Sequence, residues 1–172
     1  MKLYSKLIPT IAREIVELLM RDGDIEVEVM RVADAELDLA AIMREYISSE
    51  ERVNQAAREA LERRGHDYSK FHQVKREMAD IRNFKLGDEG IEVVINQMLE
   101  FLLISRNVEE VFAEDHIMRP KLLEVMKRHC AVDGEIDREA RVRLKHLQEG
   151  TGAYEIEYQK IVEQIRRTRG LI

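Results

Sequence analysis

Glu17-Leu18-Leu19-Met20 and Glu100-Phe101-Leu102-Leu103 are the stretches that decide the fold, because the second repeats the first. Sliding the sequence against itself by 83 residues superposes them and aligns apolar positions on both sides. Further pairs at this offset are Ile8/Ile91, Ile11/Val94, Ile15/Met98, Leu39/Leu122, Met43/Met126 and Leu61/Leu144. One gapless offset that holds over about 60 positions indicates a duplicated unit. The sequence therefore predicts two repeats, residues 1–84 and 85–172, packed as one compact unit about a pseudo-two-fold axis.

Helical apolar spacing runs through both halves, and neither half contains a credible sheet. Caps and breakers place the element ends. In the first half we expect helices over residues 5–21, 34–47, 48–64 and 69–82, with a capping box at Ser48-Ser49-Glu50-Glu51 and terminators at Gly23 and Gly65. In the second half we expect helices over 88–105, from Pro120, from Asp133 to 147 and over 153–169. The predicted fold is all-α, with eight helical segments in two tandem four-helix repeats.

The segment Ile25–Val29 permits two interpretations. It alternates apolar and acidic residues like a short strand, whereas its counterpart Val108–Phe112 spaces apolar residues like a helix. We favour the helix, because one duplicated unit should keep one structure. The two most apolar helices, 5–21 and 88–105, are expected to pack against each other at the centre of the core. Because Met98–Ile104 is apolar almost all round, its helix must be covered on several sides, which also suits a homodimer.

Composition indicates the class of protein and its location. Charged residues make up 36% and hydrophobic residues 45%, with 2 Pro and no Trp, which is typical of a soluble, helix-rich protein. The single Cys130 excludes an internal disulfide and fits a reducing compartment. The N-terminus lacks the apolar run of a signal peptide, and Met98–Ile104 is too short to span a membrane. A cytoplasmic protein without a membrane segment is expected.

No residue pattern indicates catalysis, a cofactor or a metal. His129 and Cys130 are adjacent and therefore point to different sides of a helix, and no Cys-x-x-Cys motif is present. Asp133-Gly134-Glu135-Ile136-Asp137 lacks the glycine and glutamate of a calcium loop and is interpreted as a helix-end turn. Phosphate loops and the Gly-x-Ser-x-Gly motif are also missing. We therefore expect no enzyme, no cofactor and no metal site.

Basic and aromatic side chains of the last third are the candidate partner contacts. They are Arg138, Arg141, Lys145, Tyr154, Tyr158, Arg166 and Arg167. Arginines and lysines on one side of a helix can contact phosphates, but the interleaved acids favour a salt-bridged face over a nucleic-acid surface. Tyr154 and Tyr158 begin an i, i+4 stripe that suits core packing or a partner helix. Residues 119–172 have a net charge of +3 against −9 for residues 1–118, so the basic end could also meet the acidic half of a second copy.

The last helix carries a family resemblance. The run Glu149-Gly150-Thr151-Gly152-Ala153-Tyr154-Glu155-Ile156-Glu157-Tyr158-Gln159-Lys160, followed by Arg166-Arg167, resembles a hallmark stretch of the bacterial family catalogued as domain of unknown function number 507. Leu3–Pro9 and Asp22–Glu26 are similar to that family too. Two departures are Tyr154, where the family often has Trp, and Ile161, which replaces a further aromatic residue. The resemblance implies a small bacterial cytoplasmic protein, and it supplies no established activity or mechanism to carry over.

Two functions follow as hypotheses from these residues. The first is a non-enzymatic helical interaction or scaffold protein, self-associating or adaptor-like, with a protein or a second copy as its partner. The second is a nucleic-acid-associated regulator that uses the Arg/Lys-rich C-terminal third. Their salt dependence differs, because counterion release weakens nucleic-acid binding steeply as salt rises.

Overall fold

Helices form most of the chain described by the computed structural model, which covers residues 2–172. The α-helices are α1 Ile8–Arg21, α2 Val32–Arg64, α3 Phe71–Ile81, α4 Gly87–Leu102, α5 Asp115–Arg143 and α6 Gly152–Thr168. The only strands within these residues are β1 Ile25–Glu26 and β2 Glu110–Val111, which pair antiparallel. The all-α prediction is confirmed, although the prediction of no sheet overlooked this two-residue pair.

Local signals at the ends of α1 and α2 act as predicted. Pro9 lies in the first turn of α1, where its missing N–H costs no helical hydrogen bond. Gly23 follows the end of α1 with a φ of +74°, and Gly65 follows α2 with a φ of +62°. Both angles belong to the left-handed region, which glycine adopts without strain from a Cβ.

The predicted count of eight helical segments is wrong, because two predicted breaks do not exist. At the first of them, α2 continues through the predicted capping box, and no new helix begins at Ser48. The neighbouring Ser49 Oγ donates to Glu45 Oε1, one turn earlier in the same helix, at 3.2 Å. Buried Tyr46 and Val53 flank this point and hold both sides of it in the core. No glycine or proline interrupts α2 over its 33 residues.

The second missing break lies in α5, which runs through Asp133-Gly134 instead of ending there. Asp133 does not cap a helix; its Oδ1 accepts a hydrogen bond from the Tyr4 hydroxyl at 2.8 Å. Pro120 lies inside α5 and does not start it, because the Glu114 carbonyl already accepts from the N–H groups of Ile117 and Met118. Six α-helices result within residues 2–172, and the interpretation of residues 133–137 as a helix-end turn is wrong.

The preference for a helix over Ile25–Val29 is also wrong. Ile25 and Glu26 are extended and pair with Val111 and Glu110, and a short 3₁₀ turn follows over Val29–Arg31. The segment Val108–Phe112, which was expected to be helical, also contains a strand, β2. Mutual pairing satisfies backbone groups that no helix covers here.

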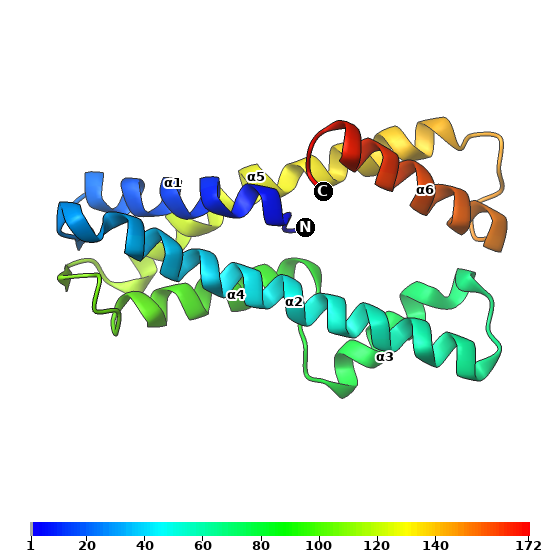
Figure 1. Ribbon diagram of the computed structural model, residues 1–172, viewed down its shortest axis with the longest axis horizontal. Coiled ribbons are helices and arrows are strands. Elements are labelled where there is room, and N and C mark those ends of the chain that lie inside the picture. Colours follow the sequence, from blue (N-terminus) through cyan, green and yellow to red (C-terminus); the bar gives the residue numbers. More distant parts are fainter. Residues whose placement is uncertain (1) are drawn as a thin grey trace.

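Four helical segments form a closed body at one end of the molecule (Figure 1). They are α1, α4, and the N-terminal halves of α2 and α5. The predicted packing of α1 directly on α4 is not what these helices do: each packs mainly on α2 and α5, so that α1 and α4 lie diagonally across one core. Both still contribute fully buried side chains to that core, among them Ile15 and Ile95.

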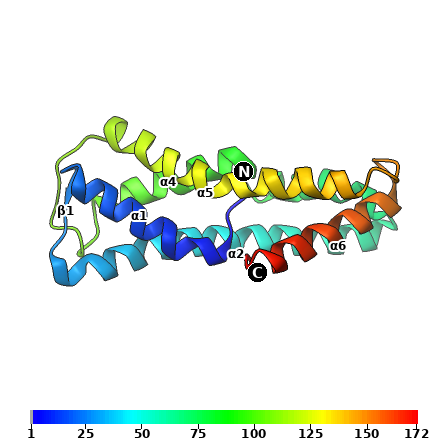
Figure 2. The same cartoon turned by 90° about the horizontal axis from the view of Figure 1, so that it is seen from above.

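Two arms extend from the body, because α2 and α5 are longer than the helices that they pack against (Figures 1 and 2). The C-terminal half of α2 pairs with α3 around Ala57 and Val74, which makes the α2–α3 arm. The C-terminal half of α5 pairs with α6 around Ile136 and Val162, which makes the α5–α6 arm. Tyr4 packs into the second arm and connects it to the N-terminal segment.

Candidate functional site

The described residues 2–172 contain no group of three His, Cys, Asp or Glu side chains that could hold a metal ion. Cys130 is buried, and burial raises the pKa of its thiol to about 11. A nucleophilic cysteine needs a thiolate near neutral pH, so this thiol is a structural core residue.

The predicted basic stripe on α5 is only partly neutralised by neighbouring acids. Arg141 Nε lies 3.0 Å from Asp137 Oδ2, and its Nη1 reaches Glu149. Arg167 pairs in the same way with Glu163. Among the residues that the structure describes, no ion pair reaches Arg138 or Lys145. Paired guanidinium groups have less to gain from a phosphate, because a carboxylate already occupies them.

The two predicted tyrosines have different environments. Tyr154 is buried, and its ring stacks on that of Tyr158 with 6.1 Å between centroids and 15° between planes. The Tyr158 hydroxyl donates to Asp137 Oδ1 at 2.6 Å. Tyr158 also lines the cleft between the arms, as does Arg166. The structure therefore places Tyr154 in a buried position near the start of α6 and brings Tyr158 and Arg166 together at the cleft.

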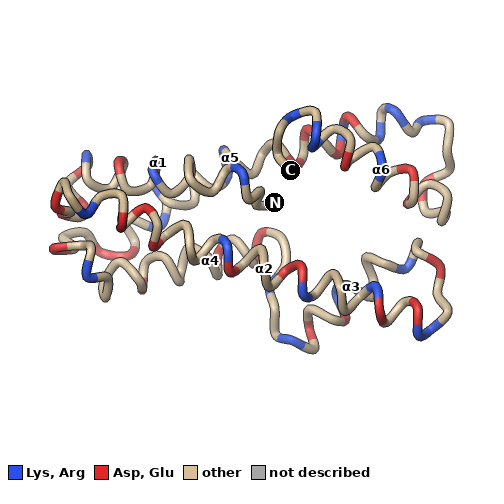
Figure 3. Tube along the Cα trace, viewed as in Figure 1, with Lys and Arg blue, Asp and Glu red and all other residues tan. Residues whose placement is uncertain are grey.

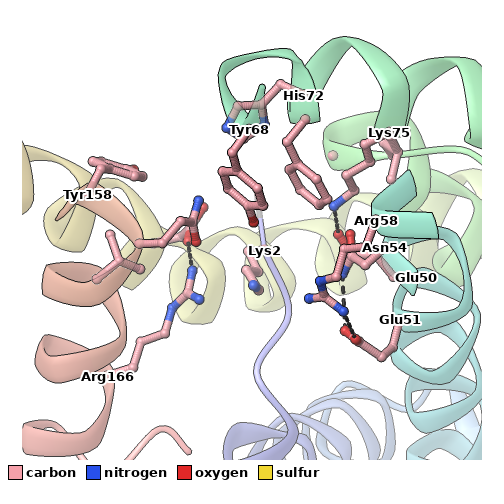
Figure 4. A pocket seen from close by; sticks show the side chains of 16 residues that line it. Lys2, Glu50, Glu51, Asn54, Arg58, Tyr68, His72, Lys75, Tyr158 and Arg166 are labelled. Carbon is pink, nitrogen blue, oxygen red and sulfur yellow. Dashed lines mark hydrogen bonds and ion pairs between the residues drawn. The ribbon is translucent and has the colours of Figure 1, made fainter. Parts of the chain in front are cut away.

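A polar cleft of about 430 Å³ separates the two arms (Figure 4). One wall consists of side chains of α2 and α3, including Glu50 and Lys75, and the other of side chains of α6, including Arg166. Lys2 from the N-terminal segment lies between the walls (Figure 4). Sequence analysis missed Lys2, Glu50 and Lys75, because these residues are distant in sequence and meet only through the fold.

A second surface, here named the end cap, lies at the opposite end of the molecule, beyond the four-helix body. It comprises residues 22–38 and 100–119, which connect α1 to α2 and α4 to α5 (Figures 1 and 2). Seven of the eleven large apolar side chains that the structure leaves exposed belong to it: Val29, Met30, Leu37, Leu103, Ile104, Phe112 and Ile117. Met30 is 92% exposed and Val29 is 88% exposed. Clustered apolar exposure of this kind marks interaction surfaces.

The end cap is also the most acidic part of the chain. Its residues include 12 Asp and Glu against 3 Lys and Arg, a net charge of −9, while the whole chain has −6. Figure 3 shows acidic positions along both of its connecting segments. The remainder of the chain therefore has a net positive charge, and the negative potential is concentrated where apolar side chains are exposed.

Buried and half-buried polar contacts fix the backbone of the end cap. Asp24 is 5% exposed, and its Oδ2 lies 2.6 Å from Lys121 Nζ on α5. The carbonyl of Asp24 accepts from the N–H groups of Phe112 and Ala113. Asp38 Oδ2 accepts from Ser105 Oγ at 2.9 Å and from Asn107 Nδ2 at 2.8 Å. The exposed apolar side chains are thus presented by segments that are tied to the body.

An apolar pocket of about 280 Å³ opens in the end cap between the end of α4 and the start of α5. Leu99, Leu103 and Met118 line it, and Glu114 and Asp115 are among its polar residues. Leu103 and Ile104 were expected to lie in a helix covered on several sides, but α4 ends at Leu102 and leaves them 69% and 75% exposed. The sequence signal that could have indicated this exposed surface is the number of Asp and Glu residues on both sides of Leu103 and Ile104.

One family model matches the chain. It is described as protein of unknown function (DUF507), and it matches residues 1–171. The chain therefore belongs to this family, as the motifs around Gly150–Lys160 indicate. No curated protein matches the sequence. Within residues 2–172 no helix combines the length and the apolar character needed to cross a membrane.

Proposed function

We propose that this DUF507 protein is a non-catalytic adaptor whose end cap docks a basic, amphipathic segment of a partner protein. The observation that carries the proposal is the coincidence, on one end of the molecule, of seven exposed large apolar side chains and a net charge of −9. An apolar face with acidic surroundings is complementary to a helix that has apolar residues on one side and Lys or Arg on the other.

Charge argues for a different protein as the occupant and against a second copy. Two end caps face to face would bring two surfaces of net −9 together, and like charges suppress such a contact. The basic arm of another copy is a weaker fit, since Arg141, Arg143 and Arg167 already pair with acids of their own helices or loops. On that arm, Arg138 and Lys145 are the candidate contacts that lack an ion pair among the described residues. A partner with unpaired basic residues meets neither obstacle.

The apolar pocket of the end cap supplies an anchor point. A side chain of Leu or Phe size from the partner fits a pocket lined by Leu99, Leu103 and Met118, and burying such a side chain contributes about 1.5–3 kcal/mol. A basic residue next to that anchor would reach the exposed carboxylate of Glu114, whereas Asp115 already pairs with Arg119. An apolar anchor that is buried at the centre of an interface, with charged residues around it, usually contributes most of the binding free energy.

A designed peptide with Leu and Lys at helical spacing is the probe for this proposal, measured by fluorescence anisotropy against the full chain. Phe112→Ser removes an apolar side chain that is 57% exposed on the end cap. The matched control is Val142→Ser, which changes a side chain that is 60% exposed on the α5–α6 arm. We expect Phe112→Ser to weaken binding about tenfold and the control to change it less than about twofold.

The same experiment includes outcomes that overturn the proposal. A peptide with Glu in place of every Lys should bind poorly; equal binding would show that apolar contact without charge recognition drives association. Light scattering gives the second check. A doubled mass that Phe112→Ser reduces to the monomer value would identify a second copy as the occupant.

We also infer that the chain is a tandem repeat with a pseudo-two-fold arrangement. The order of elements supports this inference: α1, β1, α2 and α3 are followed by α4, β2, α5 and α6, and the two strands pair with each other. The sequence offset of 83 agrees, since α2 begins at Val32 and α5 at Asp115. A cytoplasmic location belongs to the same proposal, and the free, buried Cys130 is compatible with it.

A further inference from the structure

The cleft between the arms is bounded on four sides. Its walls are the two arms, the N-terminal segment with Lys2 crosses it on the side of the body, and the arms meet at their far ends. There the Asp67 carboxylate lies beside Gly152, so close that a Cβ on that glycine would lie 2.5 Å from Asp67 Oδ2. His72 Nε2 lies 3.8 Å from Glu155 Oε2 across the same gap. The cleft is therefore a defined space and not a gap between independent arms.

Most charges in the cleft are paired within one wall. Lys75 Nζ lies 2.8 Å from Glu50 Oε1, and both side chains are less than one-fifth exposed. Arg58 Nη1 lies 3.0 Å from Glu51 Oε1. These two pairs neutralise the wall formed by the α2–α3 arm.

Two cations remain incompletely neutralised, and they lie close together. Lys2 has no carboxylate within ion-pair distance among the described residues, and its Nζ lies 5.9 Å from the centroid of the Tyr4 ring. The guanidinium of Arg166 lies 5.5 Å from that same centroid, and its nearest carboxylate oxygen, on Asp133, is 3.8 Å away. Burial lowers the pKa of Lys2 and the nearby Arg166 charge lowers it further, while the more weakly acting carboxylates of Glu50 and Asp133 oppose this shift. An anion placed between Lys2 and Arg166 would offset both the burial of the Lys2 ammonium and the repulsion between the two cations.

We propose that the cleft binds a small phosphate monoester, with its phosphate held between Lys2 and Arg166. A phosphate carries about −1.5 to −2 charge near pH 7, which matches one unpaired and one loosely paired cation. Arg166 uses Nε to donate to the Tyr4 hydroxyl at 3.3 Å, so the fork of its guanidinium is held in place for a second acceptor. Neither Lys2 nor Arg166 is part of the end cap, so this site is independent of the docking function.

The space beyond the phosphate accounts for the organic part of the ligand. A cavity of about 430 Å³ is larger than an inorganic phosphate needs and lies in the range of small-molecule pockets. Tyr68, stacked on Phe71, and Tyr158, stacked on Tyr154, line it from opposite arms. Asn54 Oδ1 is buried at this wall without a hydrogen-bond partner. Aromatic rings and an unpartnered acceptor suit a planar group with N–H donors, so the expected class is a nucleoside monophosphate.

Calorimetric titration of the full chain with inorganic phosphate and with adenosine monophosphate, at constant ionic strength, tests this site. Lys2→Gln is the primary variant, because Lys2 has no ion pair whose loss would leave a charge behind. We expect it to weaken adenosine monophosphate binding about tenfold. The matched control for Arg166→Gln is Arg167→Gln, since Arg167 points to the surface and pairs with Glu163. The first should weaken binding about tenfold and the second less than about twofold.

Each result decides the proposal. Tighter binding of adenosine monophosphate than of phosphate supports the monoester, and equal binding reduces the site to a phosphate site without recognition of the ring. Absence of saturable binding by both probes overturns the proposal, as does equal weakening by Arg167→Gln and Arg166→Gln. Circular dichroism melting of each variant separates a lost contact from a lost fold, because Lys2→Gln should melt at the wild-type temperature.

Discussion

The body and the arms of this protein are built from the same two long helices, yet they differ in how those helices are covered. Eleven of the twelve largest fully buried side chains lie in the body, and only Ile136 lies in an arm. The α2–α3 arm relies on small residues such as Ala57 and Ala60. A helix covered on several sides buries large aliphatic residues, whereas a helix with one partner keeps one face for solvent or ligand. Most of the stability from packing is therefore located in the body. The cleft lies between the arms, where each long helix packs against a single helical partner.

The largest expected effect comes from a charge in the body. Leu19→Asp and Leu102→Asp place a carboxylate at positions that are 0% and 2% exposed, with no cation to pair with. Each should cost more than about 4 kcal/mol and unfold both halves of the chain together. Circular dichroism melting would show this as loss of the single cooperative transition.

The fragment of residues 1–84 sharpens the same comparison. It contains α1, α2 and α3 but lacks α4 and α5, which cover Ile15 and Leu19 in the body. We expect it to be molten or aggregated. A sharp thermal transition and a dispersed amide spectrum would instead make each half an independent domain.

A charge in an arm should have a more local effect. Val74→Asp changes a residue that is 2% exposed in the core of the α2–α3 arm. We expect a cost of about 3 kcal/mol that falls mainly on this arm, because its apolar cluster is separate from that of the body. Hydrogen exchange should show lost amide protection in α3 and residues 53–64, with protection retained in α1 and α4. Equal loss in α1 would show that arm and body unfold as one unit.

The link between the N-terminal segment and the α5–α6 arm should be worth less. Tyr4→Phe removes the hydrogen bond to Asp133 and should cost about 1–2 kcal/mol. Burial and this bond raise the pKa of Tyr4 from its usual 10.0 to about 12. Between these values the folded state keeps a proton that the unfolded state loses, so Tyr4 contributes stability that falls as the pH rises through this window. Denaturant titrations of both proteins should therefore show a shallower alkaline decline for Tyr4→Phe; parallel curves would contradict this assignment.

The smallest effect is expected at the start of α6. Thr151 Oγ1 accepts from the N–H of Tyr154 at 3.2 Å and caps this helix. Thr151→Ala should cost about 1 kcal/mol, while Thr151→Ser should keep the cap and cost less. Urea titration measures both. An unchanged midpoint for the alanine variant would mean that the cap contributes nothing to the arm.

The all-helical class and most helix ends could be predicted from sequence because they depend on local chemistry. Gly23 and Gly65 end helices through their own backbone freedom, which requires no knowledge of the fold. The capping patterns at Ser48 and Asp133 predicted helix breaks that do not exist, because such a pattern depends only on the local sequence. Burial on both sides of each position, by Tyr46 and Val53 and by Cys130 and Ile136, keeps the helix continuous, and burial is set by the whole fold.

The candidate sites were harder to predict than the helices. Tyr158 and Arg166 were identified as partner contacts, and both line the cleft, but Lys2 approaches them only because the N-terminal segment crosses between the arms. The exposed apolar surface of the end cap was not predicted, because the apolar run Met98–Ile104 indicates a helix that is buried up to Ile104. The helix ends at Leu102, and the remaining apolar residues then face solvent.

The continuity of α2 and α5 has a mechanical consequence. Each helix runs from the cleft to the neighbourhood of the end cap, and α2 is about 50 Å long. The two helices differ in how easily they bend, since α2 contains neither glycine nor proline. In α5, Gly134 lies between Cys130, in the core of the body, and Ile136, in the core of the α5–α6 arm. Glycine lowers the cost of bending a helix. We therefore expect α5 to bend more easily than α2, with Gly134 as the position of least resistance.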